Sequence, residues 1–303
     1  MAKQMKLRGA VVPMITPVTV AGLLDEPAAG RLIDFLLAGG VDGIFVLGTT
    51  GEGASVPRDL RKRLVELAVA KARGRALVYA GIGDSQAESA ASGNEFLRAG
   101  ADVIVARPPV SYPADQLLAW YQSLLEHLEG PLIVYNIPTT TNISIPLDLI
   151  EKLLGHPRLV GIKDSENNPE RLEELLRRFG GRPDFAIFVG VGALMARGLK
   201  LGAVGVVPSV GNLIPEVCRN LCACAERGDW ATAEDCFARM NAVAALYQKG
   251  RTLNESLAVL KGAVHCRGLC APCVLPPLRA LSESELKKLR GEMSRLRLLD
   301  HAS

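Results

Sequence analysis

The chain has 303 residues, of which 49% are hydrophobic and only 5% are aromatic, enough for one large α/β domain or two medium ones. The formal net charge of +3 is too small to indicate binding to nucleic acid or to an anionic membrane. We therefore expect a soluble globular protein that binds neither.

The N-terminal segment superficially resembles a secretory signal, because basic residues precede the apolar stretch GAVVPMITPVTVAGLL. Pro13 and Pro17 interrupt that stretch and no clean cleavage site follows it, so a first buried strand is the better interpretation. No segment has the ~20 uninterrupted apolar residues of a membrane helix. A cytoplasmic location is the default expectation.

Short apolar runs recur along the whole first part of the chain. They are nearly continuous rather than alternating, which is typical of parallel strands that are covered on both faces. The eight runs lie at residues 10–16, 43–48, 76–82, 102–107, 131–136, 159–164, 185–190 and 203–209.

The segments between these runs have helical periodicity. Between the fourth and fifth runs, for example, Leu117, Tyr121, Leu124 and Leu128 fall on one stripe before Gly130 ends the helix. Eight strand–helix units predict a closed (β/α)₈ TIM barrel over residues 1–225. The alternative is an open doubly wound sheet, which is less favoured because no GxGxxG follows the first strand.

Strand signals stop after residue 212. Helical segments follow at 214–227, 230–249, 253–265 and 283–298. We therefore predict a C-terminal helical extension over residues 226–303.

Polar side chains follow several of the predicted strands, and in a TIM barrel these carboxyl ends meet at the active-site face. Lys163 ends an apolar strand, where a lysine is seldom buried without a partner. Tyr135 ends the fifth strand, and Thr49 and Thr50 follow the second in GTTGEG. We expect them to share one barrel mouth with residues that end the seventh and eighth strands, Gly190 and Val207.

These residue types predict Schiff-base chemistry. A desolvated lysine amine is a nucleophile that can condense with a ketone, and a phenol such as that of Tyr135 can transfer protons. The hydroxyls of Thr49 and Thr50, with N–H groups of the glycine-rich turn, suit a small carboxylate. A 2-oxo acid offers both groups. GTTGEG lacks the Lys-Ser/Thr ending of a nucleotide-binding P-loop, and we expect no cofactor and no metal.

Three motifs in this order, GTTGEG, YNIP and GIKDS, resemble the dihydrodipicolinate synthase/N-acetylneuraminate lyase family of class I, pyruvate-dependent aldolases. The resemblance covers about residue 8 to residue 300. It implies a (β/α)₈ barrel, a Schiff base on Lys163, proton transfer by Tyr135 with Thr49, and assembly into a homotetramer or dimer. The binding positions that it implies around the 2-oxo acid are Gly48, Thr49, Thr50, Gly190 and Val207.

Two positions depart from the synthases of that family. Where they have an arginine after YN-x-P this chain has Thr140, and where they have a tyrosine after the fourth strand it has Val110, with Tyr112 two residues further on. The stretch GVGAL (190–194) also departs from the sialic acid lyases. We therefore expect an aldolase or dehydratase for 2-oxo-3-deoxy sugar acids or 4-hydroxy-2-oxo acids. Thr140 would contact the substrate, and Arg107 or another residue could supply the missing charge.

Two other functions stay open. One is a 4-hydroxy-tetrahydrodipicolinate synthase, which condenses pyruvate with aspartate semialdehyde. The other is a non-catalytic barrel that binds an oxo acid.

All seven cysteines lie between Cys218 and Cys273, which does not look like a secreted disulfide framework. The C-x₃-C-x₂-C spacing of Cys266, Cys270 and Cys273 matches an iron–sulfur motif, and with His265 it could form a zinc site. Packing as small buried hydrophobes is the favoured interpretation. None of the four histidines is expected at the barrel mouth, so we expect no metal-dependent aldolase; they are His127, His156, His265 and His301.

Overall fold

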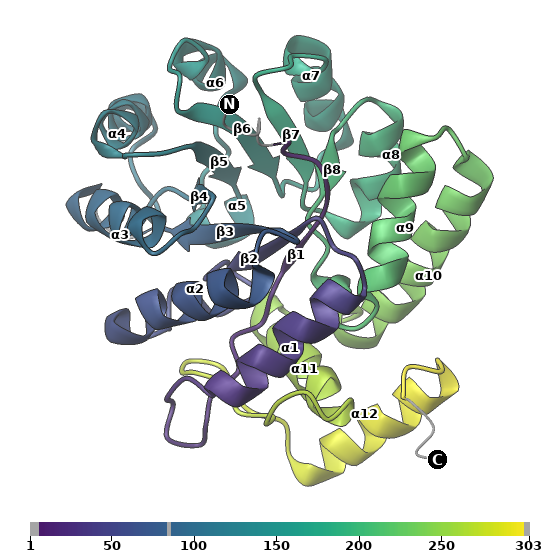
Figure 1. Cartoon of the computed structure of the whole chain (residues 1–303). Helices are drawn as coiled ribbons and strands as arrows, with labels where there is room; N and C mark the ends of the chain where they lie inside the picture. Colours follow the sequence, from purple (N-terminus) through teal and green to yellow (C-terminus); the bar gives the residue numbers. More distant parts are fainter. Residues whose placement is uncertain (1–5, 84–85, 300–303) are drawn as a thin grey trace.

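The computed structural model describes residues 6–83 and 86–299. Its centre is a closed barrel in which each parallel strand pairs with the next and β8 pairs with β1 (Figure 1). The TIM barrel prediction is confirmed. The strands are β1 (Gly9–Pro13), β2 (Gly43–Val46), β3 (Leu77–Ile82), β4 (Val103–Ala106), β5 (Leu132–Asn136), β6 (Leu159–Asp164), β7 (Ala186–Val189) and β8 (Gly205–Val206).

Helices surround the barrel on its outside (Figure 1). Those that connect or follow the strands are α1 (Glu26–Ala38), α2 (Arg58–Ala72), α3 (Gln86–Arg98), α4 (Ala114–His127), α5 (Pro138–Thr141), α6 (Leu147–Leu153), α7 (Pro169–Phe179), α8 (Met195–Lys200) and α9 (Pro215–Glu226), with 3₁₀ turns η1 (Gly192–Leu194) and η2 (Ser209–Asn212).

The last strand is much shorter than its apolar run. The sequence predicts a strand over 203–209, but β8 ends at Val206 because Pro208 offers no N–H and η2 begins at Ser209. Beyond β8, Asn212 of η2 connects this part of the chain to the end of β1 and the residues that follow it. Its Nδ2 donates to the carbonyls of Pro13 (2.9 Å) and Ser209 (2.8 Å), and its Oδ1 accepts from the N–H of Ile15 (3.0 Å).

Strand alternation divides the apolar residues into two cores. Outward-facing side chains pack with the surrounding helices into the large core. Inward-facing side chains fill the barrel in the manner of TIM barrels. This inner cluster consists of Val11, Phe45, Tyr79, Val103, Val105, Ile133, Tyr135, Ile137, Ala186, Phe188 and Val207.

The C-terminal extension is helical, as predicted, and consists of α10 (Trp230–Gln248), α11 (Leu253–Cys266) and α12 (Glu283–Arg295). The division of the chain at residue 225 stays a prediction. In the part of the chain that the structure describes, no helix is both long and apolar enough to cross a membrane.

Candidate active site

Lys163 lies inside the barrel. Its place in β6 is opposite Tyr135 of β5 in the strand register, and it is only 6% exposed. The Nζ atom lies 3.8 Å from the centre of the Tyr135 ring and 4.9 Å from that of Phe45. An amine and a phenol are therefore held together with little solvent around them.

The surroundings of Tyr135 alter the acidity of its phenol. Burial raises the pKa of Tyr135, but the nearby charge of Lys163 and hydrogen bonding with Lys163, Thr49 and Ser165 outweigh it, so that the net pKa falls below its usual value. A lowered pKa increases the fraction of the phenol that is present as phenolate, which is the form that can accept a proton. The site thus contains a nucleophile and a group suited to proton transfer.

The GTTGEG turn follows β2 and places Thr49 against Tyr135. Its backbone folds on itself, because the N–H groups of Gly51 and Gly53 both donate to the carbonyl of Gly48 (3.0 and 3.1 Å). The Thr16 hydroxyl connects the turn to the segment after β1 by donating to the carbonyl of Gly51 at 2.6 Å.

Gly190 and Val207 lie next to Lys163. A Cβ at position 190 would come within 3.2 Å of Lys163 Cε and 2.0 Å of Ser165 Oγ, so only glycine leaves room for both side chains. Val207 and Lys163 line the same small void of about 10 Å³ inside the barrel.

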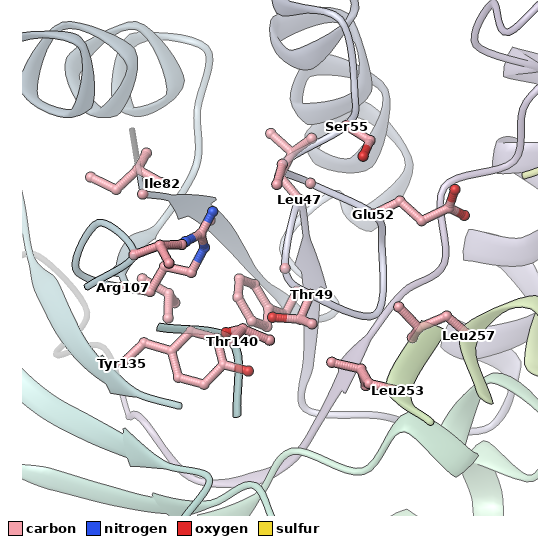
Figure 2. Close-up of a pocket in the computed structure, with 18 of the residues that line it drawn as sticks. Leu47, Thr49, Glu52, Ser55, Ile82, Arg107, Tyr135, Thr140, Leu253 and Leu257 are labelled. Atoms are coloured by element: carbon pink, nitrogen blue, oxygen red, sulfur yellow. The ribbon is translucent and has the colours of Figure 1, made fainter. Parts of the chain in front are cut away.

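A larger cavity of about 260 Å³ opens above the inner cluster. Figure 2 shows Arg107, Thr140 and Tyr135 together on one side of it, and Leu47, Glu52 and Leu257 on the other. The C-terminal extension supplies one wall through α11 and the loop after it. The polar and charged residues around the cavity are Thr49, Glu52, Ser55, Arg61, Arg107, Tyr135, Thr140 and Asn254.

The remaining sequence-predicted positions differ in how close they come to this cavity. Gly48 and Thr140 line it, whereas Thr50 is half-buried and does not line it. Val110 lies at the rim and is 58% exposed. Tyr112 does not line the cavity but packs against the Trp120 ring, with 6.4 Å between ring centres.

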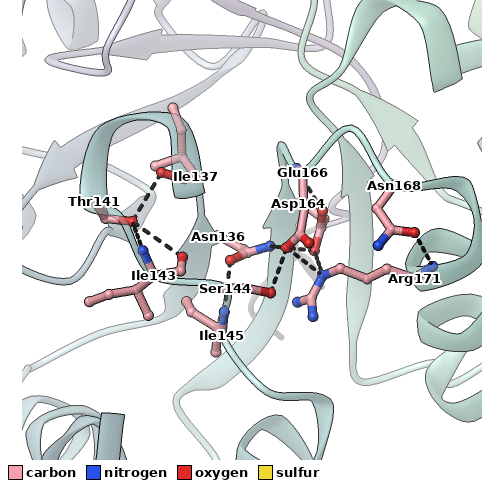
Figure 3. Close-up of polar contacts among 10 residues, drawn as sticks. All are labelled: Asn136, Ile137, Thr141, Ile143, Ser144, Ile145, Asp164, Glu166, Asn168 and Arg171. Carbon is pink, nitrogen blue, oxygen red and sulfur yellow. Dashed lines mark hydrogen bonds and ion pairs between the residues drawn. The ribbon is translucent and has the colours of Figure 1, made fainter. Parts of the chain in front are cut away.

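A polar network supports the reactive pair from outside the barrel (Figure 3). Asn136 and Asp164 directly follow Tyr135 and Lys163 and lie opposite each other in the register. Asn136 Nδ2 donates to Asp164 Oδ2 (3.0 Å), and Arg171 Nε donates to the same oxygen (2.9 Å). Glu166 joins the network by accepting from Asn136 (3.1 Å) and from the Ser144 hydroxyl (2.7 Å).

A buried ion pair links the GTTGEG turn to the C-terminal extension. Glu52 adopts a positive φ of 55°, and its carboxylate pairs with Lys261 of α11, which is fully buried. The same carboxylate accepts a hydrogen bond of 2.6 Å from the N–H of Leu275. The Glu52 carboxylate therefore joins the turn to two separate segments of the extension, α11 and the loop that contains Leu275.

Sequence reasoning missed this ion pair, the polar network and Ser165. Lys261 carried a signal, because it is the one charged residue within the apolar run SLAVLKGAV. Arg171 carried none, since an arginine in a charged helix usually faces solvent.

None of the cysteines and histidines that the structure describes lines the cavity. Cys266 and Cys270 are buried, Cys273 is half-buried, and His265 Nδ1 lies 2.9 Å from the carbonyl oxygen of Cys270. Within residues 6–83 and 86–299, no three His, Cys, Asp or Glu side chains are grouped to hold a metal ion. His301 lies outside the described residues.

Comparison with known proteins gives one consistent result. The model of the dihydrodipicolinate synthetase family matches residues 6–296. A 4-hydroxy-tetrahydrodipicolinate synthase from Thiobacillus denitrificans is 33% identical over 305 residues, covering 99% of this chain and 100% of the relative. One from Anaeromyxobacter sp. is 31% identical, covering 97% and 98% respectively.

Solved structures of proteins from the same family are also similar to this chain. The dihydrodipicolinate synthase of Bacteroides thetaiotaomicron superposes with a TM-score of 0.91 at 31% identity, covering 97% of this chain and 100% of that one. YagE from E. coli K12, a prophage protein of the dihydrodipicolinic acid synthase family solved in complex with pyruvate, has a TM-score of 0.89 at 28% identity, with coverage of 96% and 99%.

Proposed function

We propose that this chain, which belongs to the dihydrodipicolinate synthetase family, forms a Schiff base between Lys163 and a 2-oxo acid. That 2-oxo acid contains a pyruvate unit. The chain is an enzyme of that family, a class I aldolase or lyase. The observation that carries the proposal is the buried Lys163 amine, 3.8 Å from the ring centre of Tyr135.

In the proposed reaction the Tyr135 phenolate takes a proton from the Lys163 ammonium, and the resulting neutral amine attacks the keto carbon C2. Tyr135 returns a proton to the departing hydroxyl, so that one water leaves and an iminium forms, which withdraws electrons from the neighbouring bonds. Tyr135 then takes the proton of a hydroxyl at C4, the C3–C4 bond breaks, and an aldehyde leaves while the electron pair forms an enamine. Protonation at C3 and hydrolysis return pyruvate and free Lys163. Thr49 passes protons to and from Tyr135.

Turn and strand-end groups hold the 2-oxo acid in this scheme. Thr49 and Thr50, with N–H groups of the turn that begins at Gly48, bind its carboxylate. Gly190 and Val207 form the wall beside Lys163, and Thr140 contacts the tail of the substrate.

For the substrate we favour 2-oxo-3-deoxy sugar acids or 4-hydroxy-2-oxo acids. Thr140 and Val110 stand where a synthase would have an arginine and a tyrosine, and the cavity of about 260 Å³ extends beyond Tyr135 to the C-terminal extension. A longer, polar tail fits this space.

The second candidate is condensation of pyruvate with aspartate semialdehyde. The names of relatives 31% and 33% identical over nearly the whole chain support it. An enzyme of this second kind would consume aspartate semialdehyde together with pyruvate, whereas the favoured enzyme would release pyruvate from hydroxy-oxo acids. Assays of the two reactions distinguish the candidates. In either case we expect a homotetramer or dimer that acts in the cytoplasm.

Borohydride reduction in the presence of pyruvate tests the Schiff base directly. We expect the intact mass of the wild type to increase by one reduced pyruvate, and that of Lys163→Met to stay unchanged. Lys200→Met, which changes an exposed lysine on α8, is the matched control and should be labelled like the wild type. An adduct that persists in Lys163→Met would refute the proposal.

A further inference from the structure

We propose that Asn136 and Asp164 are positioning residues, whose contact holds β5 and β6 in a shifted register that turns Lys163 into the barrel. This inference deepens the proposed function and rests on it, because it concerns the placement of the same amine. Neither residue lines the cavity, so both would act on the substrate only through Lys163 and Tyr135.

The pairing of β5 with β6 shifts by one residue near its start. Leu132 lies opposite Leu159. The next residue, Ile133, lies opposite Gly161, so Val160 is an extra residue in β6. Such a β-bulge reverses the face of the sheet to which the following side chains point.

The extra residue decides which way Lys163 points. Leu159 packs into the large core outside the barrel, whereas Val160 packs against the inner cluster. Strict alternation from Leu159 would point Lys163 outward, toward the surrounding helices. With the bulge, Lys163 lies inside the barrel and opposite Tyr135. The amine and the phenol therefore meet only in the shifted register.

Glycine makes room for this bulge. A Cβ at Gly161 would lie 2.3 Å from the carbonyl oxygen of Ala186 on β7, so no larger residue fits there. The backbone groups that form the ladder are the same in either register. Side chains must therefore select the shifted one.

The contact between Asn136 and Asp164 makes that selection. These residues directly follow Tyr135 and Lys163, and Asn136 Nδ2 donates to Asp164 Oδ2 at 3.0 Å (Figure 3). Without the shift, Asn136 would lie opposite Lys163 and its amide would lose the carboxylate. Both side chains are almost fully buried, at 0% and 4% exposed, and a buried polar group without a partner is costly.

Further hydrogen bonds hold the two side chains in place. Asn136 Oδ1 accepts from the N–H of Ile145 at 3.0 Å. Asp164 accepts from the N–H of Glu166 at 3.0 Å and from Arg171 Nε at 2.9 Å. A slip of either strand would therefore break several buried hydrogen bonds at once.

Removal of the Asn136 amide tests the inference. We expect Asn136→Leu to trap pyruvate with borohydride roughly 10- to 100-fold more slowly at saturation, because a displacement of about 1 Å can have such an effect. The half-saturating concentration of pyruvate should change little, since the turn at Thr49 is untouched. Tyr135 should titrate at a higher pH than in the wild type, because the Lys163 charge that lowers its pKa would lie further away.

Two further variants control for other effects. Asn136→Asp combined with Asp164→Asn exchanges the two groups, which keeps the net charge and a carboxylate–amide bond between the strands. This variant should recover most of the trapping rate. Leu36→Ala, which truncates a fully buried leucine of α1, should lower the free energy of unfolding without changing the trapping rate or the Tyr135 titration.

Other results would overturn the inference. A folded Asn136→Leu with the trapping rate and the Tyr135 titration of the wild type would show that the contact has a structural role only, whatever its stability. An exchange variant as slow as Asn136→Leu would show that the bond between the strands is not what matters. If Asn136→Leu does not fold, the smaller Asn136→Ala takes its place in the same measurements. If the wild type traps no pyruvate, the proposed function fails, and the Tyr135 titration still tests the positioning.

Discussion

Lys163 alters the acidity of Tyr135, because its amine and the phenol ring are buried within contact distance. The charge of Lys163 is the main influence that lowers the Tyr135 pKa against the opposing effect of burial. If Tyr135 acts as a base, kcat should rise as the pH rises through this lowered pKa.

Removal of the Lys163 charge gives a prediction that needs no substrate. In Lys163→Met burial still raises the pKa of Tyr135 but its cationic neighbour is gone, so Tyr135 should titrate above about 10, the ordinary value, instead of below it. Tyrosinate absorbance measured against pH checks this, and Tyr135→Phe identifies which step of the titration belongs to Tyr135. A Tyr135 titration at the same or lower pH in Lys163→Met would show that the amine does not set its acidity.

Single residues could be predicted from the sequence where one rule decides them. The rule that strand ends meet at one face of a TIM barrel located Lys163, Tyr135 and Thr49, because each follows an unambiguous apolar run. It placed Thr50 with them, although Thr50 does not line the cavity. Ser165 was missed because the side chain that it contacts, Tyr135, lies on the neighbouring strand, and no local sequence pattern contains that contact.

The elements of the fold are joined at the site by the Glu52–Lys261 pair, which connects the GTTGEG turn to α11. Lys261→Met would leave the Glu52 carboxylate buried without its counter-charge. Breaking one side of a buried pair costs about 3–5 kcal/mol, so the free energy of unfolding in urea should fall by that amount. Lys200→Met, which removes an exposed pair with Glu234, should cost at most about 1 kcal/mol.

A double variant separates the buried charge from lost packing. Glu52→Gln combined with Lys261→Met contains no unpaired charge, and the glutamine can still accept from the Leu275 N–H, so it should recover most of the lost stability. If the double variant is no more stable than Lys261→Met alone, the loss comes from packing and the ion pair is unimportant.

Elements could be predicted better than their contacts. Near-continuous apolar runs indicated all eight strands, and helical periodicity indicated the extension. The length of β8 could not be predicted, since the apolar run continues to Ser209 while the next hydrogen bonds to the β1 region come from Asn212, which lies outside the run. The ion pair of Lys261 also depends on how α11 packs, which no local pattern contains.

At the scale of the whole molecule, barrel closure brings distant segments of the chain to one mouth. The turn after β2, the ends of β4, β5 and β6, and α11 all contribute side chains to one region. The family similarity extends over residues 6–296 and therefore covers the C-terminal extension as well as the barrel. Assembly into a tetramer or dimer stays a prediction, which sedimentation of the full chain would test.

The central claim is that this convergence positions Lys163 to bond with a keto carbon. A crystal structure of the full chain grown with pyruvate tests it most directly. We predict continuous density from Lys163 Nζ to C2 of pyruvate, with the carboxylate at the GTTGEG turn and the Tyr135 hydroxyl within hydrogen-bonding distance. Pyruvate bound elsewhere in the barrel, with the Lys163 side chain unmodified, would contradict the claim.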